Sequence, residues 1–116
     1  MKSIVEEKSF KFAVRIVRLY KYLTEKKKEK ILSKQLLRSG TSIGANIAEA
    51  EQAQSNADFV SKLSIALKET SETKYWIKLM KETEYLSIEE CESIMADCVE
   101  IEKILVTIIK KKKTKE

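Results

Sequence analysis

Four basic residues near the start of the chain have a spacing that suits phosphate binding. Lys8, Lys11, Arg15 and Arg18 follow one another at intervals of three, four and three residues, and Tyr22 continues the series. In an α-helix this spacing places the side chains on one face, as a basic ridge that ends in an aromatic ring. Such a ridge suits the phosphate backbone of a nucleic acid. The alternative is a solvated helix face, which is what most charge runs are.

Two lysine clusters extend the candidate nucleic-acid-binding surface. One follows the ridge and the other closes the chain: Lys26, Lys27, Lys28 and Lys30, then Lys110, Lys111, Lys112, Lys113 and Lys115. The net charge is +5, and residues 1–30 carry ten Lys or Arg against four Glu. In an antiparallel bundle the two clusters lie at opposite ends and cannot form one patch within a chain. Acidic residues near the ridge are expected to neutralise part of it: Glu89, Glu90, Glu92, Asp97, Glu100 and Glu102.

The residue type that enzymes use most often in acid–base chemistry is missing. The chain has no histidine, the commonest general base and the most versatile metal ligand. Glu49, Glu69 and Glu72 remain as a carboxylate cluster for two metal ions, but the Glu-x-x-His pattern of di-metal bundles is impossible here. Cys91 and Cys98 lie about two helical turns, roughly 10 Å, apart, which excludes a direct disulfide and favours buried side chains. We therefore expect no catalytic residue, cofactor or bound metal.

A stripe of polar residues runs along one narrow face of the second predicted helix. Its members recur every three or four residues: Gln35, Arg38, Ser42, Asn46 and Glu49. Polar groups beside an apolar seam are costly unless paired, so the stripe is expected to fix the register of a helix or subunit contact. The expected partners of Arg38 are Glu69 and Glu72 on the third predicted helix, where Trp76 lies nearby.

Gly40 and Gly44 lie inside the same predicted helix, where each costs roughly 1 kcal/mol relative to alanine. Together with Ala48 they form a face of small residues beside the apolar stripe. Such a face would let another helix approach closely. The alternative is a break in the helix at Ser39-Gly40.

Four helices must position these residues. Apolar residues recur at helical spacing, and the chain has no proline. The predicted helices are residues 3–24, 30–53, 56–83 and 88–110, with a basic tail at 110–116, and the segment 24–30 holds no expected core residue. Capping-box spacing marks three starts: Ser3 with Glu6, Ser55 with Asp58, and Ser87 with Glu90. Short connections force antiparallel neighbours, which predicts an all-α fold, an antiparallel up-down-up-down four-helix bundle.

The predicted helices carry more apolar surface than one interior needs. In the first, apolar residues cover about half of the helical wheel, more than the ~100° stripe that a surface helix usually buries. In the third, Ile65, Trp76 and Leu79 lie away from Leu63 and Leu67. An isolated chain exposing such patches would aggregate, so self-association into a ring or dimer is expected. The alternative is a splayed bundle that buries both stripes itself.

Length and composition place the chain among small intracellular proteins. Its 116 residues, 43% hydrophobic and 35% charged, are typical of one domain, residues 1–116. Basic side chains interrupt the first nineteen residues, which therefore do not read as a signal peptide, and no apolar stretch is long enough to span a bilayer. A cytoplasmic location without membrane contact is expected.

The segment Lys34–Leu79 carries a family resemblance, with the sequence KQLLRSGTSIGANIAEAEQAQSNADFVSKLSIALKETSETKYWIKL. It resembles the bacterial four-helix-bundle family named after the protein encoded in intervening sequences of 23S rRNA genes. The motif residues are Arg38, Ser42, Ile43, Asn46, Ile47, Ala48, Glu49, Ala66 and Glu72, and Ala50 replaces the family's usual glycine. Residues 10–23 fit the family more loosely, and the fourth helix matches only in length and pattern.

The resemblance implies a homopentamer similar to the accessory protein of diversity-generating retroelements, a basic barrel that engages nucleic acid and a reverse transcriptase. It implies no enzymatic activity. The first hypothesis is therefore an oligomeric scaffold that binds structured RNA, in association with the ribosome, or another nucleic acid through basic surfaces. The second is a protein–protein adaptor whose lysines serve solubility alone. An enzyme ranks third.

Overall fold

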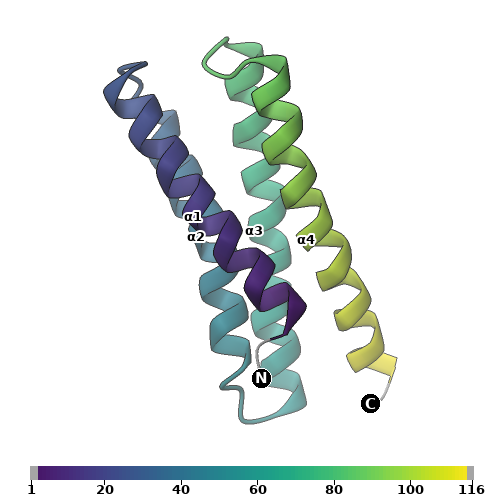
Figure 1. Ribbon diagram of the computed structural model, residues 1–116. Coiled ribbons are helices and arrows are strands. Elements are labelled where there is room, and N and C mark those ends of the chain that lie inside the picture. The colour runs from purple at the N-terminus through teal and green to yellow at the C-terminus, as the bar shows by residue number, and fades with distance from the viewer. Residues whose placement is uncertain (1–2, 115–116) are drawn as a thin grey trace.

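The computed structural model describes residues 3–114, which form four helices. In chain order these are α1 (Ile4–Glu25), α2 (Leu32–Ala50), α3 (Asn56–Glu82) and α4 (Ile88–Thr114). Successive helices run antiparallel in a long bundle of 47 × 22 × 21 Å (Figure 1). The predicted all-α, up-down-up-down four-helix bundle is confirmed.

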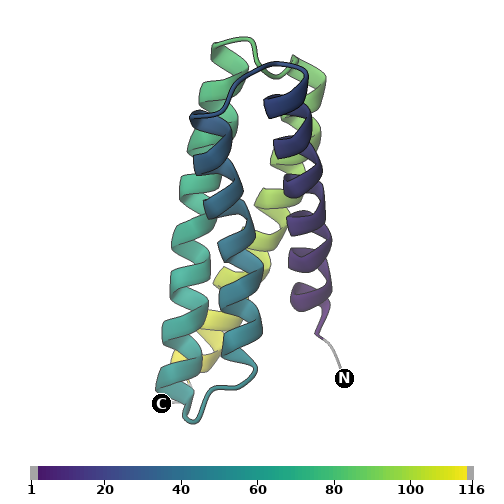
Figure 2. The same cartoon turned by 90° about the vertical axis from the view of Figure 1, so that its left-hand side faces the viewer.

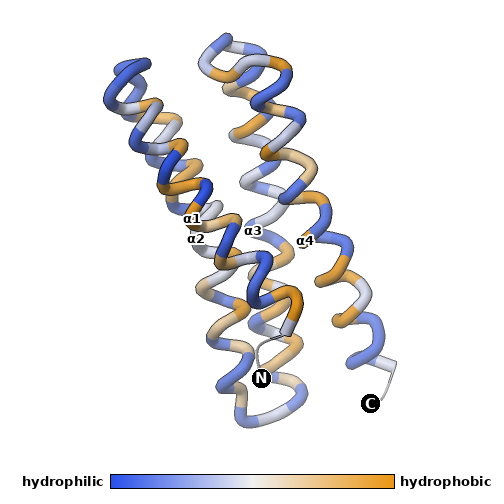
Figure 3. The backbone as a smooth tube through the Cα atoms, viewed as in Figure 1, coloured by the Kyte–Doolittle hydropathy of each residue, from blue (hydrophilic) through white to orange (hydrophobic). Residues whose placement is uncertain are grey.

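Hydrophobic and hydrophilic positions alternate along each helix, as in amphipathic helices that share a core (Figure 3). Two helices differ from their predicted bounds by more than one residue. α2 covers less than the predicted 30–53, and α4 continues through Thr114. The lysines at 110–113, predicted as a tail, are therefore helical, because Lys is a good helix former and a cation is favourable at a helix C-terminus. Lys115 and Glu116 lie outside the described residues.

The predicted capping residues hold three helix starts. Ser3 Oγ accepts a hydrogen bond from the Glu6 amide at 3.1 Å, and Ser55 Oγ accepts one from the Asp58 amide at 3.0 Å. At α4 the capping box is reciprocal. The Glu90 amide donates to Ser87 Oγ at 3.0 Å, and the Ser87 amide donates to Glu90 Oε1 at 2.8 Å.

The start of α2 is capped differently. The Glu29 carboxylate accepts hydrogen bonds from the amides of Ser33 at 2.7 Å, Leu32 at 3.0 Å and Ile31 at 3.1 Å. Burial raises the pKa of Glu29, but the Leu32, Ser33 and Ile31 amides outweigh it and hold the pKa below its ordinary value of 4.5. Glu29 is buried, although the segment 24–30 contributes no residue to the hydrophobic core, as predicted.

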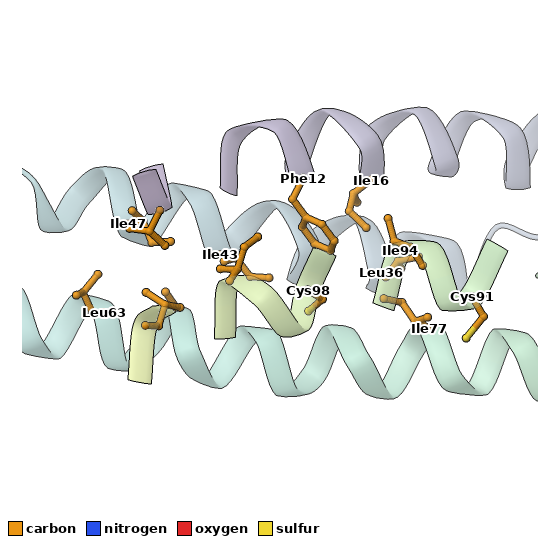
Figure 4. Packing of buried hydrophobic residues seen from close by; sticks show 14 of the residues in the cluster. Phe12, Ile16, Leu36, Ile43, Ile47, Leu63, Ile77, Cys91, Ile94 and Cys98 are labelled. Atoms are coloured by element: carbon orange, nitrogen blue, oxygen red, sulfur yellow. The ribbon is translucent and has the colours of Figure 1, made fainter. Parts of the chain in front are cut away.

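The hydrophobic core runs along the bundle and takes residues from all four helices (Figure 4). Phe12 and Ile16 of α1 meet Ile43 of α2 and side chains of α4 within it. Both cysteines are free and buried, as predicted. Burial, with a smaller contribution from the nearby Glu102 carboxylate, raises the pKa of the Cys98 thiol to about 12.

The glycine face of α2 receives α1. A Cβ atom added at Gly40 would lie 2.9 Å from Ile16 Cγ1, and one added at Gly44 would lie 3.2 Å from the Ser9 carbonyl oxygen. Side chains at either position would push α1 away. The predicted close approach is confirmed, and the alternative of a helix break is wrong, since α2 is continuous.

The four helices are not packed equally. α1 and α4 pack against each other less than α1 with α2, α2 with α3, or α3 with α4. Figure 1 shows the α1–α2 and α3–α4 hairpins as two units that diverge toward the end formed by the α1–α2 and α3–α4 connections, and Figure 2 shows α2 and α3 side by side. The bundle is therefore two hairpins joined chiefly through α2 and α3.

Candidate nucleic-acid interface

Half of the predicted basic ridge is engaged by α4. Arg15 Nη1 lies 2.7 Å from Asp97 Oδ2 and also donates to the Ser93 carbonyl oxygen at 3.2 Å. Lys8 Nζ lies 3.2 Å from Glu100 Oε2. The expected neutralisation by the acidic fourth helix occurs within one chain. These two ion pairs connect α1 to α4, the adjacent helices that pack least closely against each other.

The other half of the ridge faces solvent. Lys11 and Arg18 are exposed, and neither makes an ion pair with any of the residues 3–114. Tyr22, at the end of the series, is 39% exposed. The ridge is therefore two rows, one used in the fold and one available to an anionic partner.

The lysines between α1 and α2 form the second cluster. Lys26, Lys27, Lys28 and Lys30 are all exposed, and no ion pair involves them within the described part of the chain. Lys28 has a φ of 56°, in the left-handed region, so the chain turns sharply there. The turn displays four unneutralised cations within five residues at one end of the bundle.

The third cluster lies at the opposite end, on the last turns of α4 (Figure 1). Lys110, Lys111 and Lys113 are exposed, whereas Lys112 is half-buried, with its Nζ 5.2 Å from the centroid of the Phe59 ring. The lysines at 26–30, here called the lysine loop, and the lysines at the end of α4 form no common patch in one chain, as predicted from the topology.

The polar stripe of α2 makes two connections to α3. Arg38 Nη1 lies 3.4 Å from Glu69 Oε2, and Arg38 Nη2 pairs with Glu72, so the predicted partners are confirmed. Glu72 also accepts a hydrogen bond from Trp76 Nε1 at 3.2 Å. Farther along α2, Glu49 Oε1 lies 3.3 Å from Lys62 Nζ.

The remaining stripe residues do not reach another helix. Ser42 Oγ donates to the Arg38 carbonyl at 2.7 Å, and Asn46 Nδ2 donates to the Ser42 carbonyl at 2.8 Å. Gln35 is exposed. The stripe connects α2 to α3 through its charged members, while its neutral members bond back along their own helix.

A buried hydrogen bond between α2 and α3 was not predicted. Thr73 Oγ1 donates to Ser39 Oγ at 3.0 Å, and both residues are fully buried. Ser39 lies three residues after Leu36 and four before Ile43, so its place on the core face of α2 was the available signal. Ser39 Oγ also donates to the Leu36 carbonyl of its own helix at 3.5 Å. The pair favours one register of the two helices, because a shift would remove the acceptor of the Thr73 hydroxyl.

Among residues 3–114, no group of three potential metal-ligating residues lies close enough to hold an ion. The three glutamates considered above are instead matched with cations, Glu49 with Lys62, and Glu69 and Glu72 with Arg38. None of the described helices is long and apolar enough to cross a membrane.

Apolar surface remains exposed despite the divergence of the hairpins. Phe10 is 67% exposed, Val17 37% and Ile65 41%. A shallow groove of about 310 Å³ runs beside Phe10 between α1 and α2, and its walls include Ala13, Gly44 and Ala45. Trp76 and Leu79, by contrast, are partly buried within the chain, so the splayed-bundle alternative accounts for part of the predicted excess apolar surface.

The sequence of residues 1–107 matches the model of the 23S rRNA-intervening sequence protein family. The chain belongs to this family. Among solved structures, it is similar to a protein of unknown function from the S23 ribosomal protein family of Bacteroides thetaiotaomicron VPI-5482. The two are 62% identical over 92% of this chain and 99% of that one, with a TM-score of 0.91. No curated protein matches the chain. The resemblance stated from Lys34–Leu79 is thereby confirmed.

Proposed function

We propose that this member of the 23S rRNA-intervening sequence protein family is a non-enzymatic, self-associating cytoplasmic bundle that binds structured RNA. The supporting observation is the lysine loop, whose four exposed lysines have no ion pair within the described residues. Lysines that neutralise phosphates release the cations condensed around the nucleic acid, which gives binding that is strong at low salt and insensitive to sequence. The family name, and the ribosomal family of the similar structure, favour RNA as the partner.

The lysine loop is a better candidate for the RNA-binding surface than the basic ridge on α1. Arg15 and Lys8 already contact acidic residues of α4, and a phosphate would have to compete with them. Lys26, Lys27 and Lys28 have no such competitor among residues 3–114. Lys11 and Arg18 extend the positive surface along α1, and the lysines of α4 offer a second site at the opposite end.

Self-association is the second part of the proposal. Phe10, Val17 and Ile65 are exposed on more than one side of the bundle, and a contact between chains would remove them from water. The family resemblance favours a homopentamer. Light scattering should give a mass several times the 13.4 kDa of one chain. A stable monomer would contradict this part.

Binding is tested by fluorescence anisotropy with a labelled RNA hairpin over a range of salt concentrations. Replacing Lys26, Lys27 and Lys28 with Gln should lower the slope of log K against log salt by about 0.9 per lost phosphate contact. The matched control replaces Lys110, Lys111 and Lys113 with Gln, which changes the net charge equally at the other end. Equal losses in the two variants would show that the lysine loop is not preferred over the end of α4, and no binding by the wild type would refute RNA binding.

The groove between α1 and α2 favours a second candidate function, that of a protein adaptor. Its walls are mainly apolar, and exposed Phe10 stands beside it. If this is the function, a protein partner should remain bound after nuclease treatment, and Ala45→Glu should release it. Partner release by nuclease would count against the adaptor.

A further inference from the structure

One face of α3 combines basic, aromatic and small residues outside the surfaces described so far. Its members are spaced by three and four residues and are all exposed: Ser61, Ser64, Lys68, Ser71, Tyr75 and Lys78. This spacing places them in one line along the helix, here called the α3 strip. The strip contains two lysines, one tyrosine and three serines, and no carboxylate.

Tyr75 is the aromatic residue of this line. Its ring is 60% exposed and packs edge-on against Trp76, with 5.1 Å between centroids and 77° between planes. Trp76 in turn donates to Glu72, which pairs with Arg38 of α2. Arg38 of α2 thus orients Trp76 through Glu72, and Tyr75 packs against Trp76.

The two lysines lie on either side of this ring. Lys68 precedes Tyr75 by seven residues and Lys78 follows it by three, about 10 Å and 5 Å along the axis at 1.5 Å per residue. Neither makes an ion pair within residues 3–114. A ligand on the ring would therefore meet a free cation in both directions along the helix.

Several carboxylates on the elements around the strip are already matched with cations. Glu69 and Glu72 lie beside Arg38, and Glu82 Oε1 lies 3.6 Å from Lys81 Nζ. On the α4 side, Lys74 Nζ pairs with Glu102 at 2.8 Å. These pairs reduce the repulsion that an approaching phosphate would meet.

We propose that the α3 strip binds single-stranded nucleic acid, with a base stacked on Tyr75 and the neighbouring phosphates on Lys68 and Lys78. This inference rests on the proposed nucleic-acid binding and adds a second site for a different substrate form. A protruding ring needs an unstacked base, which single strands offer and duplexes do not. The serine positions leave room for the sugar-phosphate backbone and supply hydroxyl donors.

A second copy of this chain is a poorer occupant. Two strips facing each other would bring lysines together, and like charges across an interface are unfavourable. Of the three exposed apolar residues that favour self-association, Phe10 and Val17 lie on α1, and Ile65 alone lies on α3, beside the strip.

The single tryptophan of the chain provides the first measurement, because Trp76 contacts the proposed platform. Titration with a short single-stranded RNA should change the Trp76 fluorescence. In anisotropy measurements Tyr75→Ala should weaken single-strand binding about 5- to 150-fold, the loss that corresponds to one base–aromatic stack. Tyr75→Phe, which keeps the ring, should bind like the wild type. Lys68→Gln and Lys78→Gln should each lower the salt slope by about 0.7.

A blunt-ended RNA duplex, which offers no unpaired base, separates this site from the lysine loop. Tyr75→Ala should bind the duplex like the wild type, whereas the variant with Gln at Lys26, Lys27 and Lys28 should bind it more weakly. If that variant keeps its duplex affinity, the proposed function fails while the strip can still be tested with single strands. If Tyr75→Ala binds single strands like the wild type, or wild type binds none, the strip proposal is refuted.

Light scattering and thermal melting complete the test. Tyr75→Ala is expected to keep the wild-type mass and fold, since the ring is mainly exposed. A lower mass for Tyr75→Ala, together with unchanged single-strand affinity, would identify the strip as a contact between copies and overturn the proposal.

Discussion

The α2-facing flank of α1 and its α4-facing flank meet their neighbours in different ways. Toward α2, the backbone of α1 at Ser9 comes so close to Gly44 that a Cβ there would be 3.2 Å from the carbonyl oxygen. Toward α4, α1 packs less closely and reaches across with Arg15 to Asp97 and Ser93. One flank depends on the absence of side chains, and the other on long charged ones.

This difference shows how one helix can combine a fixed contact with an adjustable one. Close packing tolerates little change in volume, whereas exposed ion pairs contribute little and weaken with salt. Substitutions in the α2-facing flank should therefore lower the free energy of unfolding strongly, and those in the α4-facing flank weakly.

The largest expected effect is at the glycine face. Gly44→Leu should overpack the α1–α2 contact and lower the free energy of unfolding by about 1–3 kcal/mol. The control is Ala45→Leu at the neighbouring exposed position, where the added side chain meets the groove. Chemical denaturation measures both. Equal stability of the two variants would show that the close approach is not needed.

A smaller effect is expected at the connection that carries the chain from α1 to α2. Glu29→Gln should cost about 0.5–2 kcal/mol, the range measured for lost N-terminal caps. Because the folded pKa of Glu29 is below the unfolded value, its contribution is present above that value and is lost as the pH falls through the folded pKa.

The wild type and Glu29→Gln should therefore converge in stability at acid pH, below about 4.5. Urea denaturation at a series of pH values measures this difference. A constant gap between the two proteins from neutral to acid pH would contradict the charged cap. The exposed residue Glu25, at the end of α1, serves as the control through Glu25→Gln.

The smallest effect is expected at the charged flank. In a double-mutant cycle, Arg15→Gln and Asp97→Asn should couple by only about 0.2–1 kcal/mol, since both side chains are partly exposed. The coupling should decrease with added salt. A salt-independent coupling above this range would mean that the α1–α4 seam is as tightly constrained as the glycine face.

Patterns within single helices could be predicted from the sequence. The 3.6-residue period located the four helices, the serine caps marked three starts, and Gly40 with Gly44 indicated the close approach. The pairing of Arg38 with Glu69 and Glu72 could also be predicted, because opposite charges on adjacent amphipathic helices have few other partners. Each of these depends on local spacing and on which helices are neighbours.

The features that the sequence did not reveal depend on the rotation of each helix about its own axis and on the path of the backbone in the connections. The Lys8–Arg18 spacing defines one ridge, but only the angle between α1 and α4 divides it into paired and unpaired rows. Glu29 was missed because Ile31, at the cap position of α2, is not a capping residue and the carboxylate acts from two residues earlier. Ser42 and Asn46 were assigned to a helix contact, yet each finds an acceptor one turn back in its own helix.

The Glu29 cap also affects the energetics of the lysine loop. The Lys26 amide is bonded to the Tyr22 carbonyl at 2.8 Å, and the Glu29 amide to the Leu23 carbonyl at 3.0 Å. Lys27 and Lys28 therefore lie in a short turn whose backbone is held at both sides. A loop ordered before binding loses less conformational entropy when a ligand arrives, so each phosphate contact would contribute more to affinity than it would on a flexible tail.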